Sequence, residues 1–254
     1  KAVAAARKTM ADVGYDVVWR EALSAALAVA VDRLADRGST VCRPDPTPTQ
    51  SGVINTFSRF ALPITWDFAE GVALTTGSGG LLHSLDWVAR YFEHASWTAP
   101  TPTVICGSSA SSAFDGFDVI VTDPPYYDAI GYSVLMDFFY VWLRRTLAGL
   151  NGDIDRAFEA SLAPKWNRES NDGELIDDAS RFGGDREASK RNYEAGMARV
   201  FRNCHAALQP EGRFVIVFAH KHPDAWETLV GASGKAGLGV DSSWPIQTEM
   251  GNRM

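Results

Sequence analysis

The stretch FDVIVTDPPYYDAIGYSVLMDFFYVWLRRTL, residues 117–147, carries the pattern that best predicts the fold. Its first six residues are a run without polar alternation, which is typical of a parallel strand covered by helices on both faces. Residues 133–147 follow with aromatic and aliphatic side chains on several faces and two arginines near the end. We therefore predict a strand at 117–122 and a helix at 133–147, joined by a loop that begins Asp-Pro-Pro-Tyr.

Strands and helices alternate along the chain on both sides of this stretch. Apolar runs predict further strands at residues 103–107, 213–220 and 240–246. Helical spacing predicts helices at residues 19–34, 81–92, 185–208 and 223–236, and the first of these is apolar almost all round, which indicates a buried helix. Strands that alternate with helices give an α/β fold with a Rossmann-like, doubly wound and mostly parallel sheet.

Two parts of different character are expected. Residues 1–100 form a helical and irregular N-terminal part, in which the proline-rich residues 42–52 are a loop, and residues 101–254 form the α/β core. Residues 151–184 turn polar, which favours an insertion or a mobile segment over one edge of the fold. The chain starts without Met and stops without a cap or a closing strand, so we expect it to be part of a larger protein.

Composition excludes several classes of protein. A chain of 254 residues with 46% hydrophobic and 22% charged residues is neither disordered nor collagen-like. Three widely spaced cysteines form neither a disulfide framework nor a zinc knuckle, which favours a reducing, cytoplasmic location. No apolar stretch approaches the roughly 20 residues that span a membrane. We assign no metal, because the spacing of the histidines is not that of metal ligands: His83, His94, His205 and His222.

The loop at residues 123–126 suits a planar amine. In an open α/β sheet the reacting groups gather beyond the carboxyl ends of the strands. The two prolines remove two N–H donors and stiffen the loop, so it offers hydrogen-bond acceptors: the Asp123 carboxylate and the Pro124 carbonyl can each accept one N–H. Pro125 adds rigidity, and Tyr126 can stack on the ring that carries the amine. This chemistry is that of methylation of the exocyclic amine of a flipped base, because the two acceptors stabilise the positive charge that develops on nitrogen.

Asp-Pro-Pro-Tyr after a buried strand resembles the catalytic motif of amino-group DNA methyltransferases. In that family Asp or Asn at the first position goes with adenine N6, and Ser more often with cytosine N4. Residues 117–147 are similar to one subgroup, the large zinc-ribbon-associated adenine-specific DNA methylases, which include methylases of phage-defence systems. Further similar blocks are FSRFALPITWDFAE (57–70), APKWN (163–167) and FAHKHPDAWE (218–227), so the resemblance extends from about residue 27 to residue 254.

The resemblance implies a sheet of the S-adenosylmethionine-dependent methyltransferase type, with Asp123, Pro124, Pro125 and Tyr126 as catalytic residues. It implies S-adenosylmethionine as cofactor, double-stranded DNA as partner, other subunits of a restriction-modification or phage-defence system, and no membrane.

Two features of the subgroup are not in this sequence. One is the Phe-x-Gly-x-Gly loop that holds the methionine part of the cofactor, and the other is the set of zinc-ribbon cysteines. In the subgroup both lie upstream of the similar blocks. We therefore expect the main cofactor loop upstream of Lys1, and this chain to correspond to the C-terminal part of such an enzyme.

Other residues are candidates with two interpretations each. The resemblance places Trp66 and Asp67, with Glu70, near the site, although a buried Trp beside surface carboxylates is equally plausible. Tyr127 and Asp128 extend the loop and line the base pocket, or form hydrogen bonds within a turn. His220, at the end of a predicted strand, binds substrate or is structural.

Glycines and cations give further candidates. Gly77 and Gly79 precede a predicted helix and bind the cofactor through exposed N–H groups, or are a flexible helix entry. A scattered basic set in and after the polar stretch contacts phosphates or forms a solvated face, because acidic residues interleave with it: Lys165, Arg168, Arg181, Arg186, Lys190 and Arg191. The net charge of −7 gives no general attraction to nucleic acid, so such a contact is local.

Three alternatives keep the loop and change the amine: cytosine N4, an RNA base or a glutamine amide. A fourth is a non-catalytic DNA-binding or assembly subunit that has lost the cofactor loop. The sequence alone leaves all four open beside adenine N6.

Overall fold

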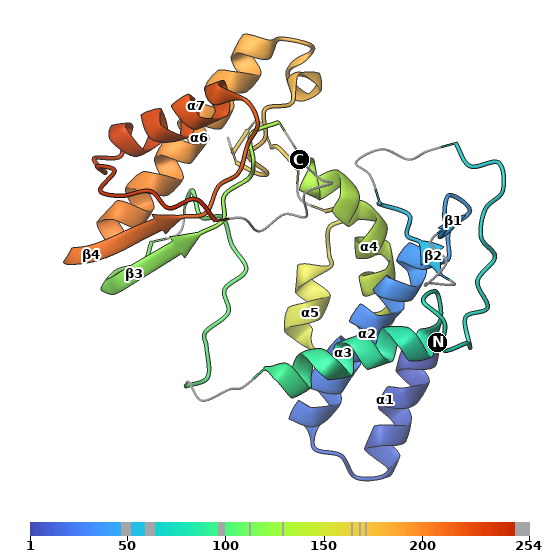
Figure 1. Ribbon diagram of the computed structural model, residues 1–254. Coiled ribbons are helices and arrows are strands. Elements are labelled where there is room, and N and C mark those ends of the chain that lie inside the picture. Colours follow the sequence, from blue (N-terminus) through green and yellow to red (C-terminus); the bar gives the residue numbers. More distant parts are fainter. Residues whose placement is uncertain are drawn as a thin grey trace. The chain divides into compact units, whose positions relative to one another are not determined.

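A computed structural model describes residues 1–46, 52–58, 64–95, 100–111, 113–128, 130–163, 165–167, 169–170 and 172–246 (Figure 1). The chain divides into two compact units: residues 1–104 with 132–164, and residues 105–131 with 165–254. Helices and a parallel strand pair occur together, so the protein is of the mixed α/β class, as predicted. The boundary expected near residue 100 stays a prediction.

The first unit is built around one long helix. This helix is α2 (Val17–Arg37), and it packs against three others: α1 (Ala2–Asp12), α3 (Leu81–His94) and α4 (Tyr132–Leu147). It begins where the Asp16 carboxylate accepts a hydrogen bond of 2.8 Å from the backbone N–H of Val18, which satisfies one unpaired donor of the first turn. Small side chains such as Ala28 are fully buried, while Trp19 and Val29 are 64% and 55% exposed. The helix is therefore buried along one side rather than all round.

The rest of the first unit is short or irregular. A short helix, α5 (Gly152–Ala157), follows α4 in the chain, and β1 (Arg43–Pro44) pairs antiparallel with β2 (Val53–Ile54). No helix among the described residues is long and apolar enough to cross a membrane.

The second unit contains a parallel strand pair and the helices that cover it. The strand predicted at 117–122 is β3 (Phe117–Thr122), and its partner is β4 (Leu208–Ile216). Between them the chain forms a 3₁₀ turn, η1 (Ala179–Phe182), and a long helix, α6 (Arg186–Ala207); after β4 comes α7 (Pro223–Lys235). Both long helices lie close to the predicted positions, since their apolar residues repeat at helical spacing.

The core of this unit lies between the two helices and one face of the strand pair. Tyr193, Met197 and Phe201 of α6 are at most 1% exposed, and α7 adds Ala225 and Leu229. Phe214 and Ile216 of β4 pack against this cluster. The unit is thus held together by apolar burial between α6, α7 and β4, which is the main stabilising contribution in such a fold.

The opposite face of the strand pair differs from the prediction. Val119 and Val121 of β3 are 55% and 65% exposed, and Val215 of β4 is 39% exposed. The sequence predicted strands buried on both faces, but α6 and α7 belong to the core on one face only. Within the described residues the parallel sheet therefore has one covered face and one open apolar face.

Two predicted strands are not formed, and one is shifted. Residues 103–107 and 240–246 carry no strand, and Val104 and Trp244 are 89% and 73% exposed. An apolar run becomes a strand only where a neighbour pairs with it. The strand predicted at 213–220 starts earlier, at Leu208, because residues 209–212 form an irregularity in the pairing: Phe117 faces Leu208, and Val119 already faces Arg213.

The polar stretch at 151–184 is partly packed into the core. Leu175 and Ile176 are 8% and 6% exposed, and Leu175 belongs to the apolar cluster of the second unit. A Cβ placed on Gly196 of α6 would come within 2.2 Å of a Leu175 methyl carbon, so the glycine allows this close contact. This part of the stretch is therefore a packed segment rather than a mobile one, because its two apolar residues anchor it on α6.

Candidate active site

The Asp-Pro-Pro-Tyr sequence forms a corner, residues 123–126, directly after β3. The pairing with β4 continues to its edge, since the N–H of Val217 donates to the carbonyl of Thr122 over 2.8 Å. Two parallel strands thus end side by side, and the segments 123–128 and 217–220 leave from the same edge of the sheet. This is the edge at which open α/β sheets collect binding groups.

The acceptors of the corner are used differently. Asp123 is exposed, and among the described residues its carboxylate has no hydrogen-bond or ion-pair partner. The carbonyl of Pro125 accepts two hydrogen bonds, one of 2.9 Å from the N–H of Tyr127 and one of 2.7 Å from the hydroxyl of Tyr193. The corner is therefore fixed through Pro125, while the carboxylate that precedes it stays open to solvent.

Aromatic rings support the end of the corner. The half-buried ring of Tyr126 meets that of Phe218 edge to face, with 5.6 Å between centroids and 81° between planes. Phe218 in turn contacts Trp226 of α7 at 5.1 Å and 90°. Edge-to-face pairs of this kind add specific geometry to apolar burial. The ring of Tyr126 is thus set by residues from beyond β4.

Tyr127 occupies an unusual backbone conformation. Its φ of 56° makes it the single non-glycine residue with positive φ in the described part of the chain. For a bulky residue this conformation is strained, and it persists where the surroundings impose it. The carbonyl of Tyr127 accepts a 3.1 Å hydrogen bond from the N–H of Asp177, and its ring meets those of Tyr193 and His220 edge to face. The ring is 9% exposed, so it supports the corner from inside.

The protonation of this inner pair of tyrosines is set by burial. Burial raises the pKa of Tyr127, and a hydrogen bond with Asp177 and the negative charge of that residue act in the same direction. Burial also raises the pKa of Tyr193, to about 12. Both phenols are therefore neutral at physiological pH and act as hydrogen-bond donors beneath the corner.

Asp128 and His220, predicted as substrate-binding residues, contact each other. The Nε2 atom of His220 lies 2.9 Å from Oδ1 of Asp128, and the two side chains are 6% and 53% exposed. The Nδ1 atom of His220 accepts the backbone N–H of His222 over 3.1 Å. The structure thus places Asp123–Asp128 and His220 in one constellation at one sheet edge.

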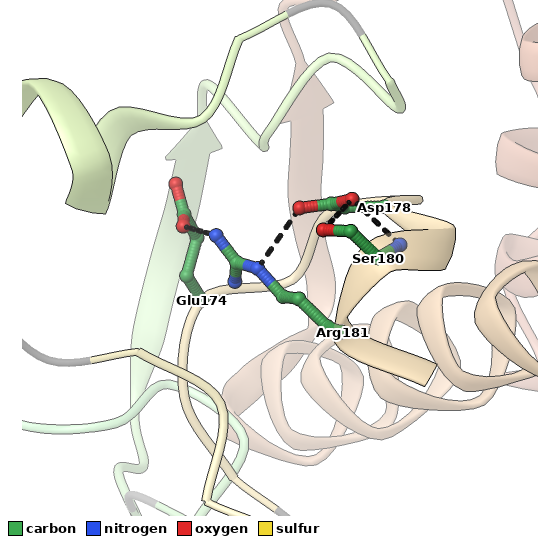
Figure 2. A network of polar contacts seen from close by, with 4 residues as sticks. All are labelled: Glu174, Asp178, Ser180 and Arg181. Atoms are coloured by element: carbon green, nitrogen blue, oxygen red, sulfur yellow. Dashed lines mark hydrogen bonds and ion pairs between the residues drawn. The ribbon is translucent and has the colours of Figure 1, made fainter. Parts of the chain in front are cut away.

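A polar network fixes the segment that carries Asp177 (Figure 2). Arg181 pairs with Glu174 at 2.6 Å and with Asp178 at 3.3 Å, and the Arg181 and Glu174 side chains are only 13% and 10% exposed. Hydrogen bonds from Ser180 to Asp178, foremost among the causes, hold the pKa of Asp178 below its usual value. The network ties residues 174–181 together, and Asp177 within them bonds to Tyr127.

The remaining candidates lie in the first unit, whereas the corner belongs to the second. Trp66 is 94% exposed and Asp67 is exposed. The alternative interpretation, a buried tryptophan beside surface carboxylates, is therefore wrong for Trp66. Gly77 and Gly79 line a cavity of about 150 Å³ before α3, together with Gly71, Thr75 and other residues. The predicted roles of Trp66 and Asp67 in substrate binding, and of Gly77 and Gly79 in cofactor binding, stay predictions.

The predicted basic set is divided between different elements of the second unit. Arg181 is committed to its carboxylate partners, and Arg186, Lys190 and Arg191 lie on α6. Arg168 lies outside the described residues.

The cavity at Gly77 and Gly79 is too small for an entire S-adenosylmethionine molecule. Pockets for ligands of that size measure about 300 Å³ or more, against about 150 Å³ here. The residues that surround it thus fit at most a part of that cofactor. Lys1 is the exposed residue directly before α1, and the main cofactor loop expected upstream of it stays a prediction.

Sequence reasoning missed Tyr193, Asp177, Phe218 and Trp226 as supports of the corner. Tyr193 lies within the helix predicted at 185–208, but nothing in the local pattern shows where its hydroxyl points. The aromatic residues at 218 and 226 do lie in a block quoted for the resemblance, which was a usable signal.

Comparison with known proteins gives no further guide. No family model, no curated protein and no solved structure matches this chain.

Proposed function

We propose that this chain carries the amine-binding site of an S-adenosylmethionine-dependent DNA methyltransferase that modifies adenine N6. The observation that carries the proposal is the exposed Asp123 carboxylate, without a partner among the described residues, at the carboxyl end of β3. A carboxylate left open beside a corner that is otherwise hydrogen-bonded is available to a ligand.

The corner supports this chemistry through the division of its acceptors. Pro125 is used internally, which leaves the Asp123 carboxylate and the Pro124 carbonyl for the two N–H groups of an amine. Fixed acceptors of this kind stabilise the positive charge that grows on the nitrogen during methyl transfer, and a fixed geometry lowers the entropic part of the barrier. S-adenosylmethionine is the methyl donor that the resemblance implies. The role proposed for the residues of this chain is to bind and orient the amine that accepts the methyl group.

Tyr126 supports a flipped base as the substrate. Its ring is held edge to face by Phe218 and remains partly exposed. Stacking on such a ring offsets part of the energy needed to take a base out of a duplex. Double-stranded DNA is accordingly the proposed partner, within a restriction-modification or phage-defence system as the resemblance implies.

The parallel strand pair supports a larger, doubly wound sheet as the proposed scaffold. The connection from β3 to β4 passes through helices and returns to a parallel neighbour, which is the repeating element of such folds. The open apolar face with Val119, Val121 and Val215 is suited to a second layer of helices.

The test is methyl transfer to defined acceptors by the full-length protein that contains this chain. That protein is incubated with S-adenosylmethionine and separately with duplex DNA, RNA and glutamine-containing peptides, and the products are hydrolysed and analysed by mass spectrometry. N6-methyladenine from DNA is the expected product. Methyl groups on cytosine N4, on RNA or on glutamine would move the proposal to that amine. DNA binding without methyl transfer to any acceptor would support the non-catalytic DNA-binding or assembly subunit instead.

A further inference from the structure

We propose that His220 and Asp128 form a positioning pair that holds residues 123–126 in their bent shape, an inference that rests on the proposed function of this corner. Neither side chain contacts the amine in this scheme. Both act through Tyr127, the strained residue that directly follows the corner.

The pair joins the two chain segments that leave the sheet. Asp128 follows the corner after β3, and His220 follows β4. The 2.9 Å contact between His220 Nε2 and Asp128 Oδ1 therefore ties the loop to the end of the neighbouring strand. The histidine side chain is 6% exposed, whereas the carboxylate is 53% exposed, so the buried histidine is the anchor and Asp128 is the residue that it holds.

The hydrogen bonds of His220 define its tautomer. The backbone N–H of His222 donates to Nδ1, so Nδ1 carries no proton. The ring proton is then on Nε2 and is donated to Asp128. The backbone of His220 is itself held, since the indole N–H of Trp226 donates to its carbonyl over 3.1 Å. The pair is thus a neutral imidazole that donates to a carboxylate. It acts through the direction of this hydrogen bond rather than through attraction between opposite charges.

The pair stabilises the left-handed backbone conformation of Tyr127. Its ring lies edge to face with His220 at 5.8 Å and 84°, and Asp128 is its chain neighbour. The pair therefore contacts both the side chain and the following peptide of the strained residue. Without it, Tyr127 is expected to relax to negative φ, because positive φ is unfavourable for residues with a Cβ. That rotation would turn the preceding Tyr126 and Pro124 away from their present directions.

Isosteric variants separate direction from charge. His220→Gln places an amide N–H at the position of Nε2, while His220→Asn is too short to do so. Asp128→Asn keeps the acceptor oxygen, while Asp128→Ala removes it. We expect His220→Gln and Asp128→Asn to retain the hold, and His220→Asn and Asp128→Ala to lose it.

Hydrogen exchange of the Tyr127 and Asp177 amides measures the hold directly. These amides donate to Pro125 and Tyr127, respectively, so they report the shape of the corner. In His220→Asn and Asp128→Ala, exchange at both amides should be faster by about tenfold, the loss expected for one hydrogen bond to a charged group. His205→Ala is the matched control, because it removes a histidine hydrogen bond to Ala236 in the same unit and should leave both amides unchanged. Unchanged exchange in His220→Asn and Asp128→Ala would overturn the proposal. Fast exchange in Asp128→Asn would overturn the claim that the direction of the hydrogen bond, rather than the charge of Asp128, holds the corner.

Methyl-transfer kinetics then distinguish positioning from substrate contact. With a positioning role, kcat falls in His220→Asn and is restored in His220→Gln, while KM for S-adenosylmethionine is unchanged. A His220→Gln variant with slow amide exchange but the low kcat of His220→Asn would show that His220 contacts the substrate, which contradicts the positioning role. If the unmodified full-length protein transfers no methyl group, the proposed function fails, and the exchange measurement still decides whether the pair holds the corner.

Discussion

The hydroxyl of Tyr193 on α6 donates a 2.7 Å hydrogen bond to the carbonyl of Pro125 in the corner. This contact joins a fully buried residue of the second unit to the exposed loop, because Tyr193 is 0% exposed and the exposed Asp123 lies two residues before Pro125. The position of the corner is thus determined by the packing of α6.

Tyr193→Phe should loosen the corner without emptying the core. The ring stays, and the Pro125 carbonyl keeps its bond from Tyr127, so we expect the free energy of unfolding to fall by about 1 kcal/mol. Urea denaturation measures this loss. Tyr140→Phe is the matched control, since its hydroxyl donates to the carbonyl of Ala160 over 2.9 Å in the first unit. The control should lose similar stability and no methyl transfer, and equal methyl transfer by both variants would argue against a role for the Tyr193 contact.

Stability should fall in alkaline solution. The pKa of Tyr193 is raised by burial to about 12, and that of Tyr127 is raised as well. A phenol in the unfolded chain titrates near about 10, so from that pH upward the unfolded state binds fewer protons than the folded state. The stability present below about pH 10 is then lost as pH rises toward 12, with a slope of up to about 1.4 kcal/mol per pH unit for Tyr193. Urea denaturation at pH 9 and pH 11 measures the change, and the double variant Tyr127→Phe, Tyr193→Phe should show a shallower decline. An equal decline in that variant would contradict the assignment.

Arg181 should be worth far more to stability than a surface arginine. The variant Arg181→Ala leaves Glu174, whose side chain is 10% exposed, without this partner. Breaking such a buried pair lowers the free energy of unfolding by about 3 kcal/mol. Arg156→Ala is the control, because Arg156 and its partner Asp153 are 69% and 88% exposed, and such pairs contribute at most about 1 kcal/mol. Thermal denaturation of the two variants makes the comparison. Similar losses would show that the network of Figure 2 does not fix residues 174–181.

Local pattern predicted five of the helices and the strand β3 close to their observed positions, but it did not predict α1 or α5. The positions of α6 and α7 follow from apolar residues at helical spacing, a property of the segment itself. Residues 117–122 were predicted as a strand and form β3. Residues 103–107 and 240–246 have similar runs but no strand, because strand formation depends on a neighbour that the run does not specify.

Sequence reasoning predicted the corner at residues 123–126 but not the residues that support it. Asp123 and the two prolines were found because their chemistry is local to four consecutive residues. The contacts that support them join residues far apart in the chain: Tyr193 with Pro125, Asp177 with Tyr127, and His220 with Asp128. The sequence predicted that Asp128 and His220 each lie at the end of a strand, but it did not predict that their side chains bond to each other. The register between β3 and β4 brings them together.

Replacement of Asp123 tests the central claim most directly. Asp123→Ala removes an acceptor from an exposed loop and no core group, so the unfolding transition should be unchanged. The measurement is the rate of N6-methyladenine formation in duplex DNA by mass spectrometry, with Asp118→Ala, an exposed carboxylate of β3, as the matched control. We predict a loss of at least about 100-fold for Asp123→Ala, as for removal of one preorganised group that stabilises transition-state charge, and no loss for the control. An Asp123→Ala protein that methylates adenine as fast as the control would contradict the account.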